Sequence, residues 1–233
     1  MSQITWYGHS AFLLAANGVS VMIDPFLAGA GGVTAASLPH VDILLVTHDH
    51  GDHVGDTVAI AKRDKAMVGA VVGTAARLEK SGVPGAQMLN GIGFNIGGTM
   101  EHMGVKMTMT QAFHSSDSGV PAGYIVVMPD GLTVYHAGDT GVFEDMRLLG
   151  GLYPIDVALL PIGGVFTMDG RQAASACKLL GCKTVVPMHW GTFPVLAQST
   201  EEFRRELAGL GTDCRCVEMG IGKAEEFLPG KRG

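Results

Sequence analysis

The chain carries little charge and has no long apolar run. Charged residues make up 16% of its 233 residues, against about 25% in an average soluble protein. Hydrophobic residues make up 47%, which excludes an intrinsically disordered chain. Since no uninterrupted apolar stretch reaches the ~18 residues of a transmembrane helix, we expect no membrane span.

Basic residues are scarce as well. There are 16 lysines and arginines against 22 aspartates and glutamates, and the formal net charge is −6. Surfaces that bind nucleic acid carry a basic stripe, so we expect no nucleic-acid partner. A surface with so few charges is compatible with self-association, which leaves a homo-oligomer open.

Cysteine is also rare, with four residues at Cys177, Cys182, Cys214 and Cys216. Cys214 and Cys216 are separated by one residue, which is closer than the usual spacing of a zinc-binding pair, and no histidine lies beside them. Disulfide frameworks are typical of small secreted domains, so the composition favours a reduced chain in the cytoplasm. We expect Cys177 and Cys182 to be buried thiols.

The order of apolar segments and turns predicts an α/β protein. The apolar run at 41–46 resembles the run at 155–160, and the spacing between them is nearly the same as that between Asp24 and Asp139. A duplicated unit of this kind would give two sheets enclosed by helices. We therefore predict a four-layer αββα sandwich of two mixed β-sheets flanked by helices, forming a single domain over 1–233.

Several elements of the first half follow from local pattern. Residues 54–65 are expected to form one helix and 67–72 a buried strand. The next helix is expected at 74–81, with Thr74 as its N-cap. The glycine-rich segment 87–113 is expected to form an antiparallel meander.

Histidine is unusually frequent, with nine residues, and three of them fall within 48–53 after a buried strand. Imidazoles and carboxylates crowded in this way compete for protons unless a cation organises them. Alternate residues of a loop can point the same way, so His48 and His50 can share one metal. Asp52 and His53 can turn toward a second, and the segment predicts metal binding.

This segment is the HxHxDH signature, and the chain resembles the metallo-β-lactamase-fold superfamily over nearly its whole length. The superfamily's later motifs are matched in order by His114, Asp139 and His189, and its early strand-end aspartate by Asp24. The residues around His9 and Asp139 resemble a bacterial and archaeal branch of metal-dependent hydrolases, which is similar to ascorbate-6-phosphate lactonase.

The resemblance implies a ligand set for two divalent metals. It assigns one metal to His48, His50 and His114, the other to Asp52, His53 and His189, and a bridging role to Asp139. β-Lactamases lack the bridging aspartate, so lactam hydrolysis is not implied. Zinc suits this histidine-rich set, and the carboxylates also admit manganese or iron.

The expected activity is hydrolysis of a small ester, lactone or phosphodiester by a metal-bridging hydroxide. Asp52 and His53 are the expected catalytic residues, with Asp52 placed to take the proton from the water. Two alternatives stay open, a non-catalytic metal-binding protein and a redox protein of the flavodiiron type. The redox alternative needs a glutamate in place of His50 and a flavodoxin domain.

Four further residues are candidates near the site. Asp24 either accepts a hydrogen bond from a metal-bound histidine or caps its loop. His9 either contacts the site or is hydrogen-bonded in the core, and the same holds for His136, for which the core is favoured. Thr167 lies in a loop that could shape a substrate pocket, or it caps the next helix.

Overall fold

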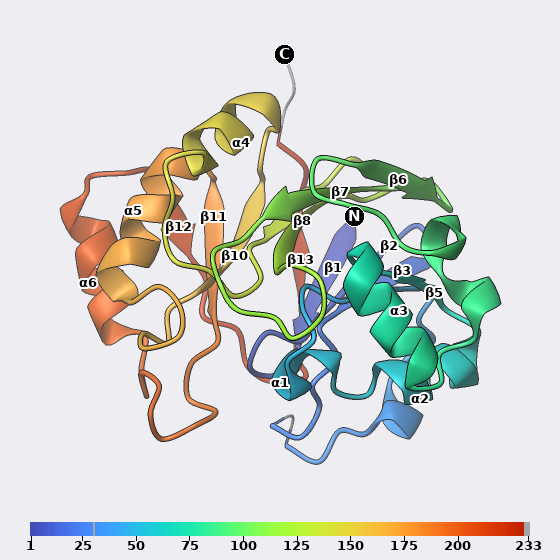
Figure 1. Ribbon diagram of the computed structural model, residues 1–233. Coiled ribbons are helices and arrows are strands. Elements are labelled where there is room, and N and C mark those ends of the chain that lie inside the picture. The colour runs from blue at the N-terminus through green and yellow to red at the C-terminus, as the bar shows by residue number, and fades with distance from the viewer. Residues whose placement is uncertain (30, 231–233) are drawn as a thin grey trace.

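The computed structural model contains two mixed sheets that pack face to face (Figure 1). The structure describes residues 1–29 and 31–230. In spatial order the first sheet contains β13 (Ala224–Phe227), β1 (Ser2–Trp6), β2 (Phe12–Ala16), β3 (Val19–Ile23), β4 (Ile43–Leu45) and β5 (Met67–Gly69). The strands from β13 to β3 are antiparallel, and β3, β4 and β5 are parallel.

The second sheet has the same plan. Its order is β12 (Arg215–Cys216), β11 (Thr184–Met188), β10 (Val157–Pro161), β9 (Thr133–His136), β8 (Ala122–Val127), β7 (Val105–Gln111) and β6 (Thr99–His102). The strands β9 to β12 are parallel, and those from β6 to β9 are antiparallel.

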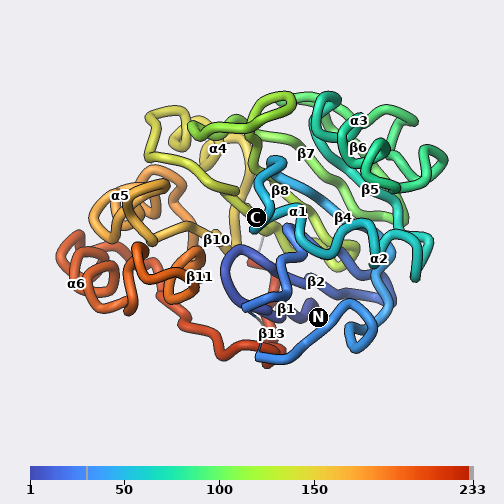
Figure 2. Tube along the Cα trace, turned by 60° about the horizontal axis from the view of Figure 1, so that its bottom comes forward, coloured from blue at the N-terminus to red at the C-terminus, as the bar shows by residue number. Residues whose placement is uncertain are grey.

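Helices cover the outer face of each sheet. The first sheet is covered by α1 (Gly51–Val54), α2 (Thr57–Asp64) and α3 (Val72–Lys80), and the second by α4 (Met146–Leu152), α5 (Gly170–Leu180) and α6 (Glu201–Gly209). Short 3₁₀ turns lie at η1 (Ala35–Ser37), η2 (Gly85–Gln87) and η3 (Leu89–Gly91). In Figure 2, which brings the bottom of Figure 1 forward, α1 lies near the centre of the view.

Three apolar clusters fill the spaces between these four layers. In β10, Leu159 belongs to the central cluster between the sheets, whereas Ala158 and Leu160 belong to the cluster under α5. Successive side chains of a strand point to opposite faces, so a strand covered on both sides is apolar throughout. The predicted four-layer sandwich is confirmed. Among the described residues, no helix is both long and apolar enough to cross a membrane.

Two local predictions are wrong. The helix expected at 54–65 is interrupted, because Gly55 has a φ of +39° and its backbone lies against Pro25, whose carbonyl oxygen would be 2.3 Å from a Cβ at Gly55. The strand at 67–72 ends at Gly69, and α3 already begins at Val72.

The cap predicted at Thr74 is also wrong. Thr74 lies inside α3, and its hydroxyl donates to the carbonyl of Ser118 at 2.8 Å. The meander at 87–113 is confirmed only for β6 and β7, because its first part forms η3.

Candidate metal centre

The candidate ligands lie in loops and in a short helix that follow strands of both sheets. His48 and His50 lie in the short loop after β4, and His50 is the N-cap of α1. Asp52 and His53 follow in the single turn of α1, where Asp52 contacts His9 and His53 reaches Asp139 of the second sheet.

The second sheet supplies three further side chains from separate strands. His114 follows β7, Asp139 follows β9 and His189 directly follows β11. The backbone N–H of His189 donates to the carbonyl oxygen of His9 at 3.0 Å, which joins the two sheets beside the centre. The structure thus brings together all seven residues that the sequence proposed as ligands.

The first group consists of His48, His50 and His114. One ring nitrogen of each lies within 4.8 Å of the others, and His48 Nε2 is 3.0 Å from His50 Nδ1. Nitrogens that share a tetrahedral zinc ion at ~2.05 Å are about 3.3 Å apart. The spacing within the group is therefore close to that of a chelated metal.

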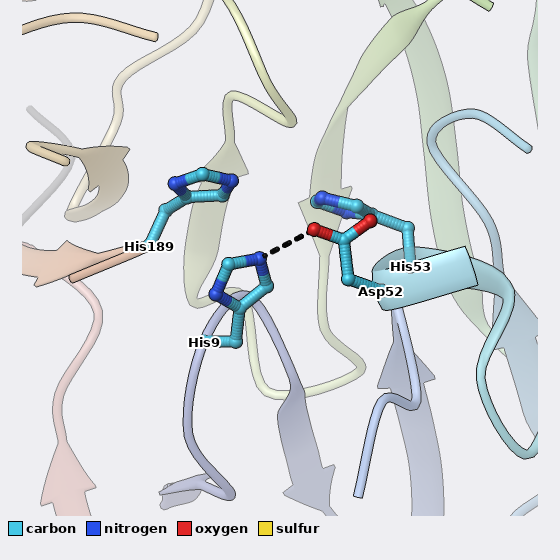
Figure 3. Close-up of side chains that lie close together, drawn as sticks. All are labelled: His9, Asp52, His53 and His189. Atoms are coloured by element: carbon cyan, nitrogen blue, oxygen red, sulfur yellow. Dashed lines mark hydrogen bonds and ion pairs between the residues drawn. The ribbon is translucent and has the colours of Figure 1, made fainter. Parts of the chain in front are cut away.

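The second group contains Asp52, His53 and His189 together with His9. Its potential ligand atoms also lie within 4.8 Å of one another. His9 Nε2 is 3.1 Å from Asp52 Oδ2, and the rings of His9 and His189 are 4.0 Å apart between centroids. The four side chains converge from α1, β11 and the loop between β1 and β2 (Figure 3).

Asp139 lies between the two groups. Its Oδ2 is 2.9 Å from His189 Nε2, 3.3 Å from His53 Nε2 and 3.6 Å from His114 Nε2. Asp139 Oδ1 is buried and makes no hydrogen bond to any described residue, and His53 Nε2 meets only the Asp139 carboxylate without hydrogen-bond geometry. Since an unpaired buried polar group is costly, these atoms fit a centre that is completed by cations.

The charges of the centre favour a cation as well. Burial disfavours the charged form of His53, but the carboxylates of Asp139 and Asp24 outweigh it and raise its pKa well above the usual value. Burial opposes ionisation of Asp139, yet His53 and His189 hold its pKa well below the usual value. Burial lowers the pKa of His48 to about 3, so its imidazole is neutral at pH 7 and able to bind a metal.

Asp24 fixes the orientation of two of these histidines. It is fully buried, and it accepts hydrogen bonds from His53 Nδ1 at 2.7 Å and from the Thr47 hydroxyl at 2.7 Å and backbone N–H at 2.8 Å. Because the Thr47 hydroxyl donates to Asp24, it accepts from His48 Nδ1 at 3.0 Å. Both imidazoles therefore donate through Nδ1 and direct Nε2 toward the centre.

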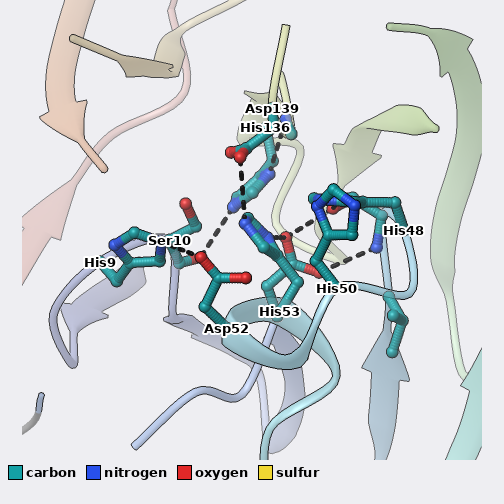
Figure 4. Close-up of polar contacts among 12 residues, drawn as sticks. His9, Ser10, His48, His50, Asp52, His53, His136 and Asp139 are labelled. Atoms are coloured by element: carbon teal, nitrogen blue, oxygen red, sulfur yellow. Dashed lines mark hydrogen bonds and ion pairs between the residues drawn. The ribbon is translucent and has the colours of Figure 1, made fainter. Parts of the chain in front are cut away.

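His9 and His136 lie in different environments. Beyond Asp52, His9 contacts the Thr192 hydroxyl through Nδ1 at 3.1 Å. His136 accepts from the Gly138 N–H at 3.1 Å, so its other nitrogen donates to the Ser10 carbonyl at 2.9 Å (Figure 4). Both nitrogens of His136 are satisfied within the core, whereas His9 faces the centre.

The centre opens into a cleft of about 280 Å³. Its lining consists of His50, Asp52, His114, Ser115, Asp139, Phe166 and His189. Thr167 is not among these residues, and the structure instead places its neighbour Phe166 at the cleft with 56% of its surface exposed. Thr167 does not cap α5 either, because Asp169 accepts from the Gln172 N–H at 2.8 Å.

Asp49, which lies between His48 and His50 in sequence, holds two loops together, a role that the sequence motif did not reveal. Its buried carboxylate points away from the centre and accepts from the Ser116 hydroxyl at 2.7 Å, the Asp117 N–H at 2.8 Å and the Ser118 hydroxyl. Arg77 donates to the same carboxylate at 2.7 Å. These bonds hold the loop after His114 against the loop that carries His48 and His50.

The two sheets, their helices and the His/Asp centre define a protein of the metallo-β-lactamase fold. The family model of the Beta-lactamase superfamily domain matches residues 3–189. A UPF0173 metal-dependent hydrolase of Nitratidesulfovibrio vulgaris is 59% identical over 225 residues, which cover 96% of this chain and 94% of that protein.

Archaeal proteins are similar too. A UPF0173 metal-dependent hydrolase of Methanopyrus kandleri is 44% identical over 96% of this chain and 99% of its own. The solved structure of Igni18, a metallo hydrolase from Ignicoccus hospitalis, is 38% identical with a TM-score of 0.87, and the match covers 97% of this chain and 99% of that one. The chain therefore belongs to the UPF0173 metal-dependent hydrolases of the β-lactamase superfamily.

Proposed function

We propose that the protein hydrolyses a small ester, lactone or phosphodiester at a centre of two divalent metals. The observation that carries the proposal is the position of Asp139, whose Oδ2 lies within 3.6 Å of imidazoles from three separate segments. A carboxylate so placed can join two metal sites, one on each side.

The proposed ligands are assigned to the two metal sites according to the two groups that they form in the structure. His48 Nε2, His50 Nδ1 and His114 would hold one ion, and Asp52, His53 Nε2 and His189 the other. Zinc is the first candidate, since neutral imidazoles and carboxylates are its usual ligands in catalytic sites. Manganese and iron accept the same donors.

Two bound ions would supply a hydroxide between them as the nucleophile and polarise the oxygen of the scissile group. Asp52 is the residue placed to accept a proton. Burial opposes its ionisation, but the hydrogen bond from His9 and the charge of His53 hold its pKa well below the usual value. Asp52 is therefore ionised at neutral pH, with its side chain 28% exposed toward the cleft.

The dimensions of the cleft support a small substrate. Its volume of about 280 Å³ lies just below the ~300–1,000 Å³ that is typical of ligand pockets. Phe166 provides an apolar wall, and Ser115 offers a hydroxyl beside His114. Lysine and arginine are absent from the described lining, so a charged group of the substrate would be recognised by the metals themselves.

Two alternatives make different predictions. A flavodiiron-type redox protein would have a glutamate in place of His50, which lines the cleft here. A non-catalytic metal-binding protein would retain its metals without turnover. Membership of a hydrolase family favours catalysis over both.

The test is metal content measured together with turnover. Protein loaded with zinc, manganese or iron would be assayed on bis(p-nitrophenyl) phosphate and on a panel of esters and lactones. We expect two metals per chain at the His/Asp centre and hydrolysis of at least one substrate class. His48→Ala should lose metal from this centre and should lose turnover. The matched control is His102→Ala, because His102 lies in β6 and outside the centre. Two metals without turnover on any substrate would support the non-catalytic alternative.

A further inference from the structure

Three of the four cysteines meet on the outside of the second sheet. Cys177 lies in the last turn of α5, Cys182 lies between α5 and β11, and Cys214 precedes β12. Their sulfur atoms all lie within 4.8 Å of one another, and the Sγ atoms of Cys182 and Cys214 are 3.6 Å apart. Sequence spacing does not reveal this group, because Cys177 and Cys182 lie at the end of α5 and Cys214 lies about thirty residues later.

The group is accessible from one side. Cys177 and Cys182 are buried, whereas Cys214 is half-buried at a cavity of about 280 Å³. Lys183 and Asp213 line the same cavity. An ion could therefore reach the three sulfur atoms from solvent without any rearrangement of the core.

The sulfur atoms of Cys182 and Cys214 are in hydrogen-bond contact, and either thiol can donate. Contacts with the sulfur atoms of Cys177 and Cys182 lower the pKa of Cys214 below its ordinary value. A thiolate, not a thiol, is the form that binds metals.

We propose that Cys177, Cys182 and Cys214 form a site for a soft metal ion, Zn²⁺ or Cu⁺, separate from the His/Asp centre. Sulfur atoms that share a tetrahedral zinc at ~2.3 Å are about 3.8 Å apart, close to the 3.6 Å between Cys182 and Cys214. Thiolates select zinc and monovalent copper over harder cations. On binding, the remaining thiols release their protons to solvent.

A disulfide fits the group less well. A bond between Cys182 and Cys214 would need an oxidant and would leave the sulfur of Cys177 unused. A metal uses all three sulfur atoms, and a water molecule from the adjoining cavity would complete a fourth position.

The site would stabilise the fold without taking part in hydrolysis. Cys182 lies before β11 and His189 follows it, so about 23 Å of extended chain separates them at ~3.3 Å per residue. A metal bound here would tie the end of α5 to the strand edge formed by β11 and β12. Binding to the folded state alone raises its stability in proportion to the logarithm of metal concentration.

Cobalt provides a direct probe, because thiolate-to-cobalt charge transfer gives an ultraviolet absorption that histidine and carboxylate ligands lack. The full-length reduced protein would be titrated with Co²⁺, and then with Zn²⁺ and Cu⁺ in separate arms to displace it. We expect the charge-transfer band in the wild-type protein and its loss in Cys214→Ser. Loss of one ligand should weaken cobalt binding at this site at least about 100-fold, since outer partners alone contribute 10–100-fold.

Cys216→Ser is the matched control, because Cys216 lies two residues away in β12 and outside the group. It should keep the band, and Cys214→Ser should contain one metal equivalent fewer than either protein. Hydrolytic activity should be equal in all three, so failure here is distinguishable from failure of the proposed function. A wild-type protein without the band, or a purified protein with a Cys182–Cys214 disulfide, would overturn the proposal.

Discussion

Each sheet has an aspartate near the end of a corresponding strand, and the two carboxylates differ in how their oxygens are satisfied. Asp24 directly follows β3 and has its oxygens occupied by Thr47 and His53. Asp139 lies three residues after β9, with Oδ1 unpartnered among the described residues and Oδ2 facing imidazoles. One carboxylate is satisfied by the protein and the other needs a cation.

Hydrogen bonds show that these aspartates are not structural equivalents. The N–H of Asp24 donates to Leu45 in β4, and the corresponding bond to Leu159 in β10 comes from Ala137. The repeated apolar runs thus place Ala137, not Asp139, at the position of Asp24. Because Asp139 lies two residues further from the strand end, it reaches the Nε2 atoms that face the centre. Asp24 instead contacts His53 at Nδ1, on the side of the ring away from the centre.

The largest effect is expected from removing the carboxylate that faces the cations. Asp139→Ala should lose at least one of two metals and reduce turnover by about 10³-fold or more, because the site for a shared ligand is lost. Elemental analysis and the substrate panel measure both. Asp145→Ala, an exposed aspartate that contacts Gln111, is the control. Two metals with full turnover in Asp139→Ala would exclude the bridging role.

The second prediction concerns the carboxylate that the protein satisfies. Asp24→Asn replaces an acceptor of three hydrogen bonds with a group that is itself half donor, so His53 loses its fixed tautomer. Metal affinity should fall about 10–100-fold while two metals still bind at saturation. Competition with a chelator measures the affinity. If Asp24→Asn lost metal as completely as Asp139→Ala, the proposed difference between the two aspartates would be wrong.

The sequence predicted most of the centre because its chemistry is local. His48, His50, Asp52 and His53 lie in one segment, and each later candidate follows an apolar strand whose end is recognisable. Parallel strands bring such ends to one edge, so position along the chain translates into position in space.

Features that depend on side-chain direction or on packing between distant loops were not predictable. Phe166 rather than Thr167 lines the cleft. The Thr74 hydroxyl donates to the Ser118 carbonyl instead of capping its own helix. The break at Gly55 depends on its contact with Pro25. The one-residue spacing of Cys214 and Cys216 did not indicate that Cys214 lies close to Cys177 at the end of α5 and to Cys182 in the loop that follows.

A third prediction tests how the first sheet holds the His114 loop. Asp49→Asn should lower the free energy of unfolding by about 1–3 kcal/mol, because several bonds to a charged acceptor are weakened. Chemical denaturation measures this loss. Asp117→Asn, whose side chain is 73% exposed, should change stability far less.

The same variant should alter the pH dependence of stability. Burial opposes ionisation of Asp49, but bonds from Ser118, Ser116, Asp117 and Arg77 hold its pKa well below the ~3.9 of an unfolded aspartate. Asp49 therefore contributes its full stability above about pH 4, and the contribution is lost as the pH falls through the folded pKa. Asp49→Asn should flatten this acidic limb, and an unchanged slope would contradict the assignment.

The smallest effect is expected at His9, which contacts the second metal group through Asp52 and faces His189. His9→Ala should retain both metals, because the sequence-proposed ligands all remain. It should reduce kcat or raise KM by about tenfold, since Asp52 loses the hydrogen bond that orients one of its oxygens. Thr192→Val removes the hydroxyl on the opposite side of the imidazole and should reproduce part of this change. Loss of a metal in His9→Ala would instead make His9 a ligand, whereas unchanged kinetics would limit it to packing between the two sheets.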